Sequence, residues 1–225
     1  RRMPQDGRST VKYNGRMIDL RVSAIPSAYG ETIVIRILDS VMGLIPLSKL
    51  GMPDPIIREL LEMLNRPQGM LFITGPTGSG KTTTLYSLLT QLSLESESVV
   101  TIEDPIEYDL KNITQIPVNE KIGFTFGSAL RSILRQDPDV IMVGEVRDSD
   151  TAQIATKAAL TGHLVLSSIH TNDTIATISR LRDLGIEPYL ISSALNAILA
   201  QRLVKKICEN CRIEYDIPPY LFENY

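Results

Sequence analysis

The segment GPTGSGKTT at residues 75–83 has the composition of a phosphate-binding loop (P-loop). It fits the pattern G-x-x-x-x-G-K-[ST], with Gly75, Gly80, Lys81 and Thr82 at the required positions. Glycines let the loop curl so that its backbone N–H groups face a phosphate, and a helix that starts at Lys81 adds the positive end of its dipole. The lysine then reaches the β- and γ-phosphates, and the threonine hydroxyl can bind Mg²⁺. The predicted loop residues are Gly75, Pro76, Thr77, Gly78, Ser79, Gly80, Lys81, Thr82 and Thr83.

Acidic residues follow two other apolar runs. DVIMVGE ends in Glu145, and TIEDPIEY carries Glu103 and Glu107 close together. If both runs are parallel strands, these carboxylates lie at the edge of the sheet where α/β proteins bind their ligands. Glu145 is then expected to hold Mg²⁺, and Glu103, with Glu107 in reserve, to orient the water that attacks a phosphate. The pattern leaves these three roles exchangeable, and it also permits acids that only face solvent.

The chain has two histidines, one at each end of the run HLVLSSIH. His170 follows the run and is expected at the same edge as the carboxylates, where its ring can hydrogen-bond a γ-phosphate oxygen. His163 precedes the run, which predicts a structural role or a place at a subunit contact.

The elements that must position these residues follow from hydrophobic periodicity. The apolar runs GMLFIT, SVVTIE, DVIMVGE and HLVLSSI have the length of buried strands. Segments with helical periodicity separate them, which predicts an α/β fold: a mainly parallel sheet flanked by helices. The expected helices are DPIIRELLEMLN, KTTTLYSLLTQLSLE, ALRSILRQ, DTAQIATKAALT and TIATISRLRDL.

The start of the chain has a different character. Asn14-Gly15 lies between two strand-like pieces, which is a strong hairpin signal, and ETIVIRIL follows as a further β-branched run. Because the chain begins without an initiator methionine, we expect it to start within a longer protein. The predicted parts are the end of a β-rich domain at 1–39, a linker at 40–53, the α/β domain at 54–205 and a cysteine-containing segment at 206–225.

Composition argues against several classes of protein. A net charge of −3, 5% aromatic residues and the absence of tryptophan argue against a protein that binds nucleic acid over its whole surface. No apolar run approaches the roughly 20 residues that span a bilayer, and no signal peptide is visible. Two cysteines in 225 residues argue against a disulfide scaffold. These features favour a cytosolic globular protein.

Four segments together carry a resemblance to a known family. GPTGSGKTTT, TIEDPIEY, LRSILRQDPDVIMVGEVRD and TGHLVLSSIHTND resemble, in this order, the Walker A motif, aspartate box, Walker B region and histidine box of the secretion ATPase superfamily. The closer resemblance is to its type II secretion and type IV pilus assembly ATPases. It covers nearly the whole chain and implies a RecA-like P-loop NTPase domain that hydrolyses ATP with Mg²⁺.

The opening segment adds to this resemblance. RMPQDGR, DLRVSAIPSAYGE and VIRILD resemble the last part of the family's second N-terminal domain. Two arginines of that domain reach the γ-phosphate, and they correspond to Arg21 and Arg36. Such an arginine neutralises charge as the phosphoryl group transfers, an effect of about 10³–10⁵ in rate.

The resemblance also implies an assembly. Family members are homohexameric rings with nucleotide between the two domains, and the predicted linker would be the hinge. The expected partner is an inner-membrane platform protein of a pilus or secretion machine, so we expect a cytoplasmic protein, peripheral at the inner membrane, with no transmembrane segment and no nucleic acid. The alternatives are a pilus-retraction ATPase, a RecA-like ring motor acting on DNA, which would need basic and aromatic pore residues, and a non-catalytic nucleotide-gated module.

CENC places Cys208 and Cys211 at the spacing of half a tetracysteine zinc site. The resemblance implies a second cysteine pair in the assembly and secretion branch, whereas the retraction branch lacks the motif. Because two thiolates rarely hold a structural metal, we expect Zn²⁺ in the intact protein rather than in this chain.

Overall fold

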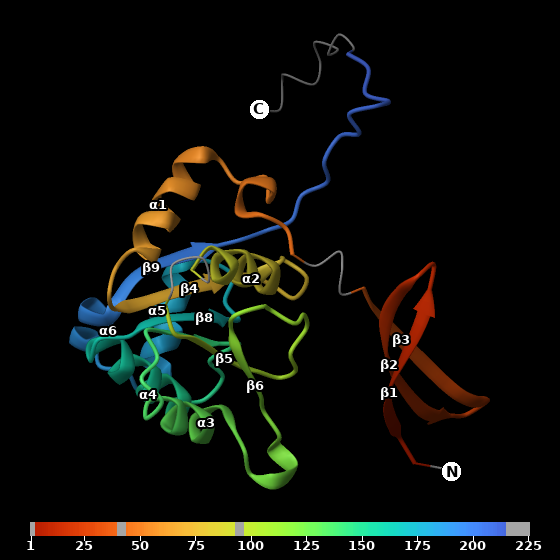
Figure 1. Cartoon of the computed structure of the whole chain (residues 1–225), viewed down its shortest axis with the longest axis horizontal. Coiled ribbons are helices and arrows are strands. Elements are labelled where there is room, and N and C mark those ends of the chain that lie inside the picture. The colour runs from red at the N-terminus through yellow and green to blue at the C-terminus, as the bar shows by residue number, and fades with distance from the viewer. Residues whose placement is uncertain (1–2, 40–43, 93–96, 215–225) are drawn as a thin grey trace.

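The computed structural model describes residues 3–39, 44–92 and 97–214. It consists of a three-stranded antiparallel sheet, a larger α/β unit built on a six-stranded sheet, and an exposed C-terminal segment (Figure 1). The predicted fold class is therefore confirmed, including the small β-rich part that precedes the α/β unit.

The N-terminal sheet has the order β1-β2-β3, and both pairs of strands are antiparallel. The predicted Asn14-Gly15 turn joins the first two strands, and both of its residues have positive φ, 49° and 79°, as tight hairpin turns prefer. The register pairs Arg8 with Arg21 and Arg21 with Arg36. Since directly paired residues share a face, the three arginines form one row. The strands are β1 (Gln5–Tyr13), β2 (Arg16–Ser27) and β3 (Gly30–Asp39).

The larger sheet has the order β6-β5-β7-β8-β4-β9, and all its neighbouring strands are parallel. Its four central strands are the four that hydrophobicity predicts, and every residue in them is buried. The strands are β4 (Gly69–Thr74), β5 (Val99–Glu103), β6 (Thr114–Pro117), β7 (Val140–Val143), β8 (Leu164–Ile169) and β9 (Leu195–Ala200).

Helices cover both faces of this sheet and divide the core in two. Because successive side chains of a strand alternate between faces, Leu71 and Ile73 of β4 pack with α1 and α2, while Met70 and Phe72 pack with α3 to α6. The helices are α1 (Asp54–Leu64), α2 (Lys81–Leu92), α3 (Phe126–Ile133), α4 (Ser149–Leu160), α5 (Thr174–Asp183) and α6 (Pro188–Ala194). Two short 3₁₀ helices are η1 (Leu47–Lys49) and η2 (Glu120–Ile122).

Several elements differ from the expectation. The strands β6 and β9 and the helix α6 were not predicted, because β6 has only four residues and β9 follows α6 without a glycine or proline between them. The helix α3 begins earlier than its periodicity indicates, since Thr125 and Ser128 form a capping box. Residues 93–95, which the sequence assigns to the end of α2, lie outside the described residues.

The expected linker at 40–53 belongs in part to the α/β unit. Leu47 is buried in the core beneath α1 and α2, and Ser87 donates a hydrogen bond to the carbonyl of Ile45 at 2.5 Å. The larger unit therefore begins before residue 54, while residues 40–43 lie outside the described part. At the other end, residues 202–214 are exposed and contain no helix or strand, and residues 215–225 are not described.

Candidate nucleotide-binding site

The predicted site residues meet at the carboxyl edge of the larger sheet. The P-loop follows β4, Glu103 ends β5, Glu145 follows β7 and His170 follows β8. These four strands are adjacent and parallel, in the order β5-β7-β8-β4, so their carboxyl ends form one edge. A cavity of about 480 Å³ opens there, and its lining includes residues 77–83, Glu107 and the other three side chains.

The P-loop packs closely against the residue that follows β9. Gly75 and Gly80 have φ values of 148° and 87°. A Cβ atom at Gly75 would lie 2.4 Å from the backbone oxygen of Gln201, and one at Gly80 would lie 2.8 Å from its side-chain nitrogen. At Gly75 both the backbone conformation and the fixed backbone oxygen therefore require glycine, whereas at Gly80 the positive φ favours glycine and a Cβ atom would displace the amide end of Gln201.

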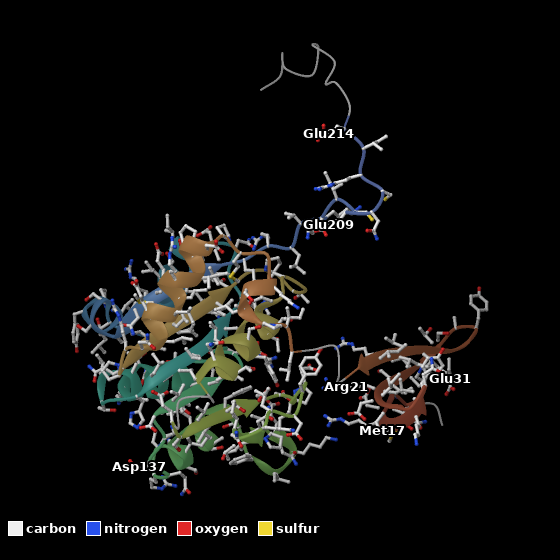
Figure 2. All side chains as sticks on the ribbon, turned by 45° about the horizontal axis from the view of Figure 1, so that its top comes forward. Met17, Arg21, Glu31, Asp137, Glu209 and Glu214 are labelled. Carbon is white, nitrogen blue, oxygen red and sulfur yellow. The ribbon has the colours of Figure 1, made fainter. Side chains whose placement is uncertain are left out.

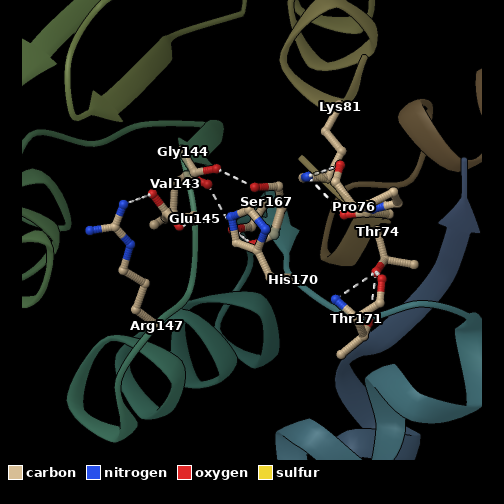
Figure 3. A network of polar contacts seen from close by, with 12 residues as sticks. Thr74, Pro76, Lys81, Val143, Gly144, Glu145, Arg147, Ser167, His170 and Thr171 are labelled. Atoms are coloured by element: carbon tan, nitrogen blue, oxygen red, sulfur yellow. Dashed lines mark hydrogen bonds and ion pairs between the residues drawn. The ribbon is translucent and has the colours of Figure 1, made fainter. Parts of the chain in front are cut away.

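Lys81 begins α2, and only 8% of its surface is exposed. Its Nζ donates hydrogen bonds to the carbonyl oxygens of Gly75 (2.8 Å) and Pro76 (3.1 Å) (Figure 3). Burial lowers the pKa of this ammonium, the negative charge of Glu145 opposes the shift, and the positive charge of Arg202 adds to it. The amine is thus held at the P-loop by carbonyl partners that a phosphate can replace.

Gln201 is a site residue that the sequence analysis missed. Its Nε2 donates to the carbonyl of Ser79 at 2.7 Å, and its Oε1 accepts from the hydroxyl of Thr84 at 2.8 Å. Its backbone N–H donates to the carbonyl of Thr74 at 2.9 Å. One side chain thus joins the end of β9 to the P-loop and α2. No local pattern indicates it, because 122 positions separate Gln201 from Ser79.

Glu145 and His170 lie together opposite the P-loop lysine (Figure 3). One oxygen of Glu145 accepts a hydrogen bond from Arg147, and the other lies 3.2 Å from Nε2 of His170. The Glu145 side chain is 15% exposed, so it faces the cavity and not only solvent. Thr82 lines the same cavity. A hydroxyl and a carboxylate are the hard oxygen donors that Mg²⁺ prefers, so the residues present fit this ion.

Glu103 lies almost completely inside the protein, with 3% of its surface exposed. Its Oε1 accepts from the hydroxyl of Thr101 at 2.6 Å and from the amide of Gln115 at 3.0 Å, and its Oε2 accepts from the hydroxyl of Tyr86. Burial, together with the hydrogen bond and the charge of Glu103, raises the pKa of the Tyr86 phenol far above its ordinary value. Both carboxylate oxygens of Glu103 are therefore already engaged.

Glu107 lies on the turn after β5 and contacts the N-terminal sheet. Nη2 of Arg21 lies 3.0 Å from its Oε2 and also donates to the carbonyl of Ile106 at 3.4 Å. In Figure 2, Arg21 lies between the two sheets. Arg36 neighbours Arg21 across the strands, and the two line a second cavity that Pro105 also borders. Within the described parts of the chain, Arg36 forms no ion pair.

The remaining candidates lie away from the cavity. His163 precedes β8 at the opposite edge of the sheet, and its Nδ1 lies 3.1 Å from the carbonyl of Ala158. Cys208 and Cys211 are exposed free thiols on the C-terminal segment. Among the described residues, no three or more His, Cys, Asp or Glu side chains are grouped so that they could hold a metal ion. In this part of the chain, the two thiols thus have no third zinc ligand nearby.

Comparison with known proteins agrees with the geometry of the cavity. The sequence model of the family described as "Type II/IV secretion system protein" matches residues 1–221. The chain belongs to this family. The "Type II secretion system protein HxcR" of Pseudomonas aeruginosa is 51% identical to it over 216 residues, which make up 96% of this chain and 46% of that protein. The "Type II secretion system ATPase E" of Vibrio cholerae is 50% identical over 216 residues, 96% of this chain and 43% of that protein.

A solved structure shows the same fold. The crystal structure of the pilus retraction motor PilT with bound ADP is 37% identical and matches with a TM-score of 0.77, covering 92% of this chain and 61% of that one. This chain, of 225 residues, spans less than half the length of the two curated relatives. In the described part of the chain, no helix has the length and apolarity needed to cross a membrane.

Proposed function

We propose that the chain is the ATP-hydrolysing part of a motor that powers the assembly of pilins or pseudopilins in a type II secretion system or a type IV pilus. The observation that carries this proposal is a single cavity lined by Lys81, Glu145, His170 and Glu107, the last of which is in contact with Arg21. A loop that only binds nucleotide does not need groups that hold a metal ion and orient water. The names of the two relatives, one of which is called an ATPase, support the assignment.

The cavity supports in-line attack of water on the γ-phosphate of ATP. The P-loop amides and Lys81 hold the phosphates, and the Thr82 hydroxyl and the Glu145 carboxylate hold Mg²⁺. When bound, this ion neutralises charge on the β- and γ-phosphate oxygens. His170 lies beside Glu145 at 3.2 Å, and we assign to it a hydrogen bond to a γ-phosphate oxygen.

Glu107 is a better candidate than Glu103 for orienting the attacking water. Both line the cavity, but the oxygens of Glu103 already accept three hydrogen bonds inside the protein. A water-orienting carboxylate must not be committed to groups that fix it inside the protein. Glu107 is 31% exposed, and among the described residues its two oxygens accept from Arg21 of the other sheet, at 3.4 and 3.0 Å, and from no group of the larger unit. We therefore assign this role to Glu107, which reverses the order expected from the sequence.

Arg21 and Arg36 are proposed to stabilise the charge that develops on the γ-phosphate. Both lie on the N-terminal sheet, and Arg21 reaches the larger unit at Glu107. Their distance from a phosphate in the P-loop therefore depends on how the small sheet is placed against the large one. This arrangement couples the nucleotide state to the angle between the two units.

For the assembled protein, we propose a homohexamer at the cytoplasmic side of the inner membrane, acting on a membrane-embedded platform protein, with Zn²⁺ bound by Cys208, Cys211 and further ligands. Identity of 50–51% to type II secretion proteins, against 37% to the pilus retraction motor, supports the secretion and assembly branch. No observation favours the DNA motor, and the net charge of −3 weighs against it.

The test is Mg-ATP hydrolysis per subunit over a range of protein concentrations. We expect activity that rises steeply with concentration as a ring assembles, and that Lys81→Ala abolishes. Glu107→Gln should lower kcat by about 10²–10⁴-fold while ATP still binds. Glu103→Gln keeps an acceptor oxygen and should cost less. A wild-type rate in Glu107→Gln would overturn its assigned role, and failure of the wild-type chain to bind Mg-ATP would overturn the nucleotide site.

A further inference from the structure

We propose that Tyr86 is a positioning residue: its hydroxyl, anchored on the buried carboxylate of Glu103, holds the backbone at Glu107 against α2 so that the Glu107 carboxylate faces the cavity. This inference rests on the proposed function, because it concerns the residue to which water orientation is assigned. It also accounts for a buried acid that the proposed mechanism does not otherwise use.

The Tyr86 hydroxyl makes two contacts of opposite kind. It donates its proton to Oε2 of Glu103 and accepts a hydrogen bond from the backbone N–H of Glu107 at 3.2 Å. A phenol has one proton to donate and lone pairs that accept. With the proton committed to the carboxylate, the oxygen is available for the N–H group. The side chain is fully buried, so no water competes for either contact.

The anchor itself is held on two sides. Thr101 and Gln115 both donate to Oε1 of Glu103, at 2.6 and 3.0 Å. A buried charge is costly unless it is fully hydrogen-bonded, and here three donors satisfy it. The Glu103 carboxylate cannot rotate without breaking these bonds. It therefore fixes the direction in which the Tyr86 hydroxyl points.

A second side chain extends the same anchor to the rest of the turn. Nε2 of Gln115 also donates to the carbonyl of Tyr108 at 3.0 Å, and its Oε1 accepts from the N–H of Leu110 at 2.7 Å. The ring of Tyr108 packs edge-on against the ring of Tyr86, with the centroids 5.6 Å apart. The backbone after β5 is thus held at three positions by two side chains that both end on Glu103.

This support bears on the rate because the turn has no regular structure of its own. Residues 104–113 contain no helix or strand, so no ladder of backbone hydrogen bonds fixes the position of Glu107. Catalytic groups must be held to within about 0.5 Å, and a displacement of about 1 Å can cost on the order of 10²-fold in rate. The contacts of Tyr86 and Gln115 replace the missing ladder.

The test begins with Tyr86→Phe, which removes one oxygen atom and keeps the ring against Tyr108. Its matched control is Ser87→Ala on the same helix, because the Ser87 hydroxyl is also buried but bonds the carbonyls of Ile45 and Thr83. In the intact protein, we expect Tyr86→Phe to lower kcat by about 10- to 100-fold, with the Kd for Mg-ATP unchanged within about twofold. Ser87→Ala should keep the wild-type kcat. If the Tyr86 hydroxyl only stabilised the fold, both variants would lose stability, and Tyr86→Phe would not lower kcat selectively.

The decisive measurement combines Tyr86→Phe with Glu107→Gln. If Tyr86 acts only through Glu107, the double variant is no slower than Glu107→Gln alone. Rate losses that multiply, or a wild-type kcat in Tyr86→Phe beside a slow Glu107→Gln, would overturn the positioning role and leave the proposed function intact. A wild-type rate in Glu107→Gln would overturn the function assigned to Glu107, and the positioning role with it.

Discussion

The two sides of the candidate site are built in opposite ways. In the larger unit, Lys81 and Glu103 are buried, and each is held by partners within the protein. On the N-terminal sheet, Arg8, Arg21 and Arg36 form one row across three strands. Of these three arginines, only Arg21 has an ion pair within the described residues. The charged groups of the larger unit thus have partners within the protein, whereas Arg8 and Arg36 have no ion pair among the described residues.

This difference shows where a ligand is needed. Like charges directly opposite each other destabilise a sheet, whereas guanidinium groups bind phosphate in strong, bidentate hydrogen bonds. The arginine row is therefore costly to the isolated sheet and suited to an anion. The buried side needs no ligand for its stability. In the proposed function, the larger unit therefore defines where nucleotide lies, and the small sheet responds to its charge.

The apolar residues differ in the same sense. Ile141 in β7 is completely buried, whereas Ile35 in β3 is 55% exposed. The larger unit has helices on both faces of its sheet, but the described part of the chain places no helix over the apolar face of the N-terminal sheet. We therefore expect most of the stability of the described fold to come from the larger unit.

The largest expected effect tests the contrast between the arginines of the N-terminal sheet and the P-loop side of the site. Arg21→Ala should lower kcat by about 10³-fold, while ATP binding at the P-loop stays near the wild-type value, because Lys81 and the loop amides remain. The control is Lys12→Ala, an exposed cation on the same face of the N-terminal sheet. Steady-state hydrolysis and nucleotide binding measure the two effects. If Arg21→Ala weakened ATP binding as much as Lys81→Ala does, Arg21 would bind ATP itself before the reaction. The contrast between the N-terminal sheet and the P-loop side would then be wrong.

A second prediction compares the packing of the two sheets. Ile141→Ala leaves a cavity in a closed core and should lower the free energy of unfolding by about 3–4 kcal/mol. Ile35→Ala removes a half-exposed side chain and should cost less than about 1 kcal/mol. Urea denaturation of both variants provides the measurement. Equal losses would break the comparison, since they would mean that the apolar face of the N-terminal sheet is covered in solution.

The smallest expected effect concerns the support of the P-loop. Gln201→Ala removes two hydrogen bonds, to Ser79 and from Thr84, and should weaken ATP binding by about tenfold. The turnover rate at saturating ATP should change little, because Gln201 is not among the residues that line the cavity. Gln153→Ala is the control, since among the described residues its amide bonds only Ser149 on the surface of α4. If both variants bind ATP like the wild type, the loop does not depend on β9.

Local signals were sufficient for most of the larger sheet. The central strands are continuous apolar runs of four to six residues, a length that favours a buried strand over a helix. The edge strand β9 escaped prediction because LNAILA has no turn residue between it and α6. Its partner is β4, about 125 residues earlier in the chain. A short-range pattern cannot contain that pairing.

The site shows the same limit. Glu145 and His170 were expected at one edge because each follows an apolar run, and the structure brings them to 3.2 Å. The sequence could not distinguish the roles of Glu103 and Glu107, since the two lie four positions apart in one acidic segment. Only Tyr86, Thr101 and Gln115 decide that Glu103 turns inward and leaves Glu107 at the cavity.

By itself, the sequence determined the phosphate loop, the α/β class and the identity of the residues that reach the sheet edge. These three features depend on the spacing and periodicity of residues within short segments, because local backbone geometry converts such patterns into loops, helices and strands. The tertiary structure alone decided that Glu103 is hydrogen-bonded inside the larger unit while Glu107 pairs with Arg21 of the N-terminal sheet, and that Gln201 bonds the P-loop. Those outcomes depend on hydrogen bonds between distant segments, and such bonds exist only after the strands have been placed side by side.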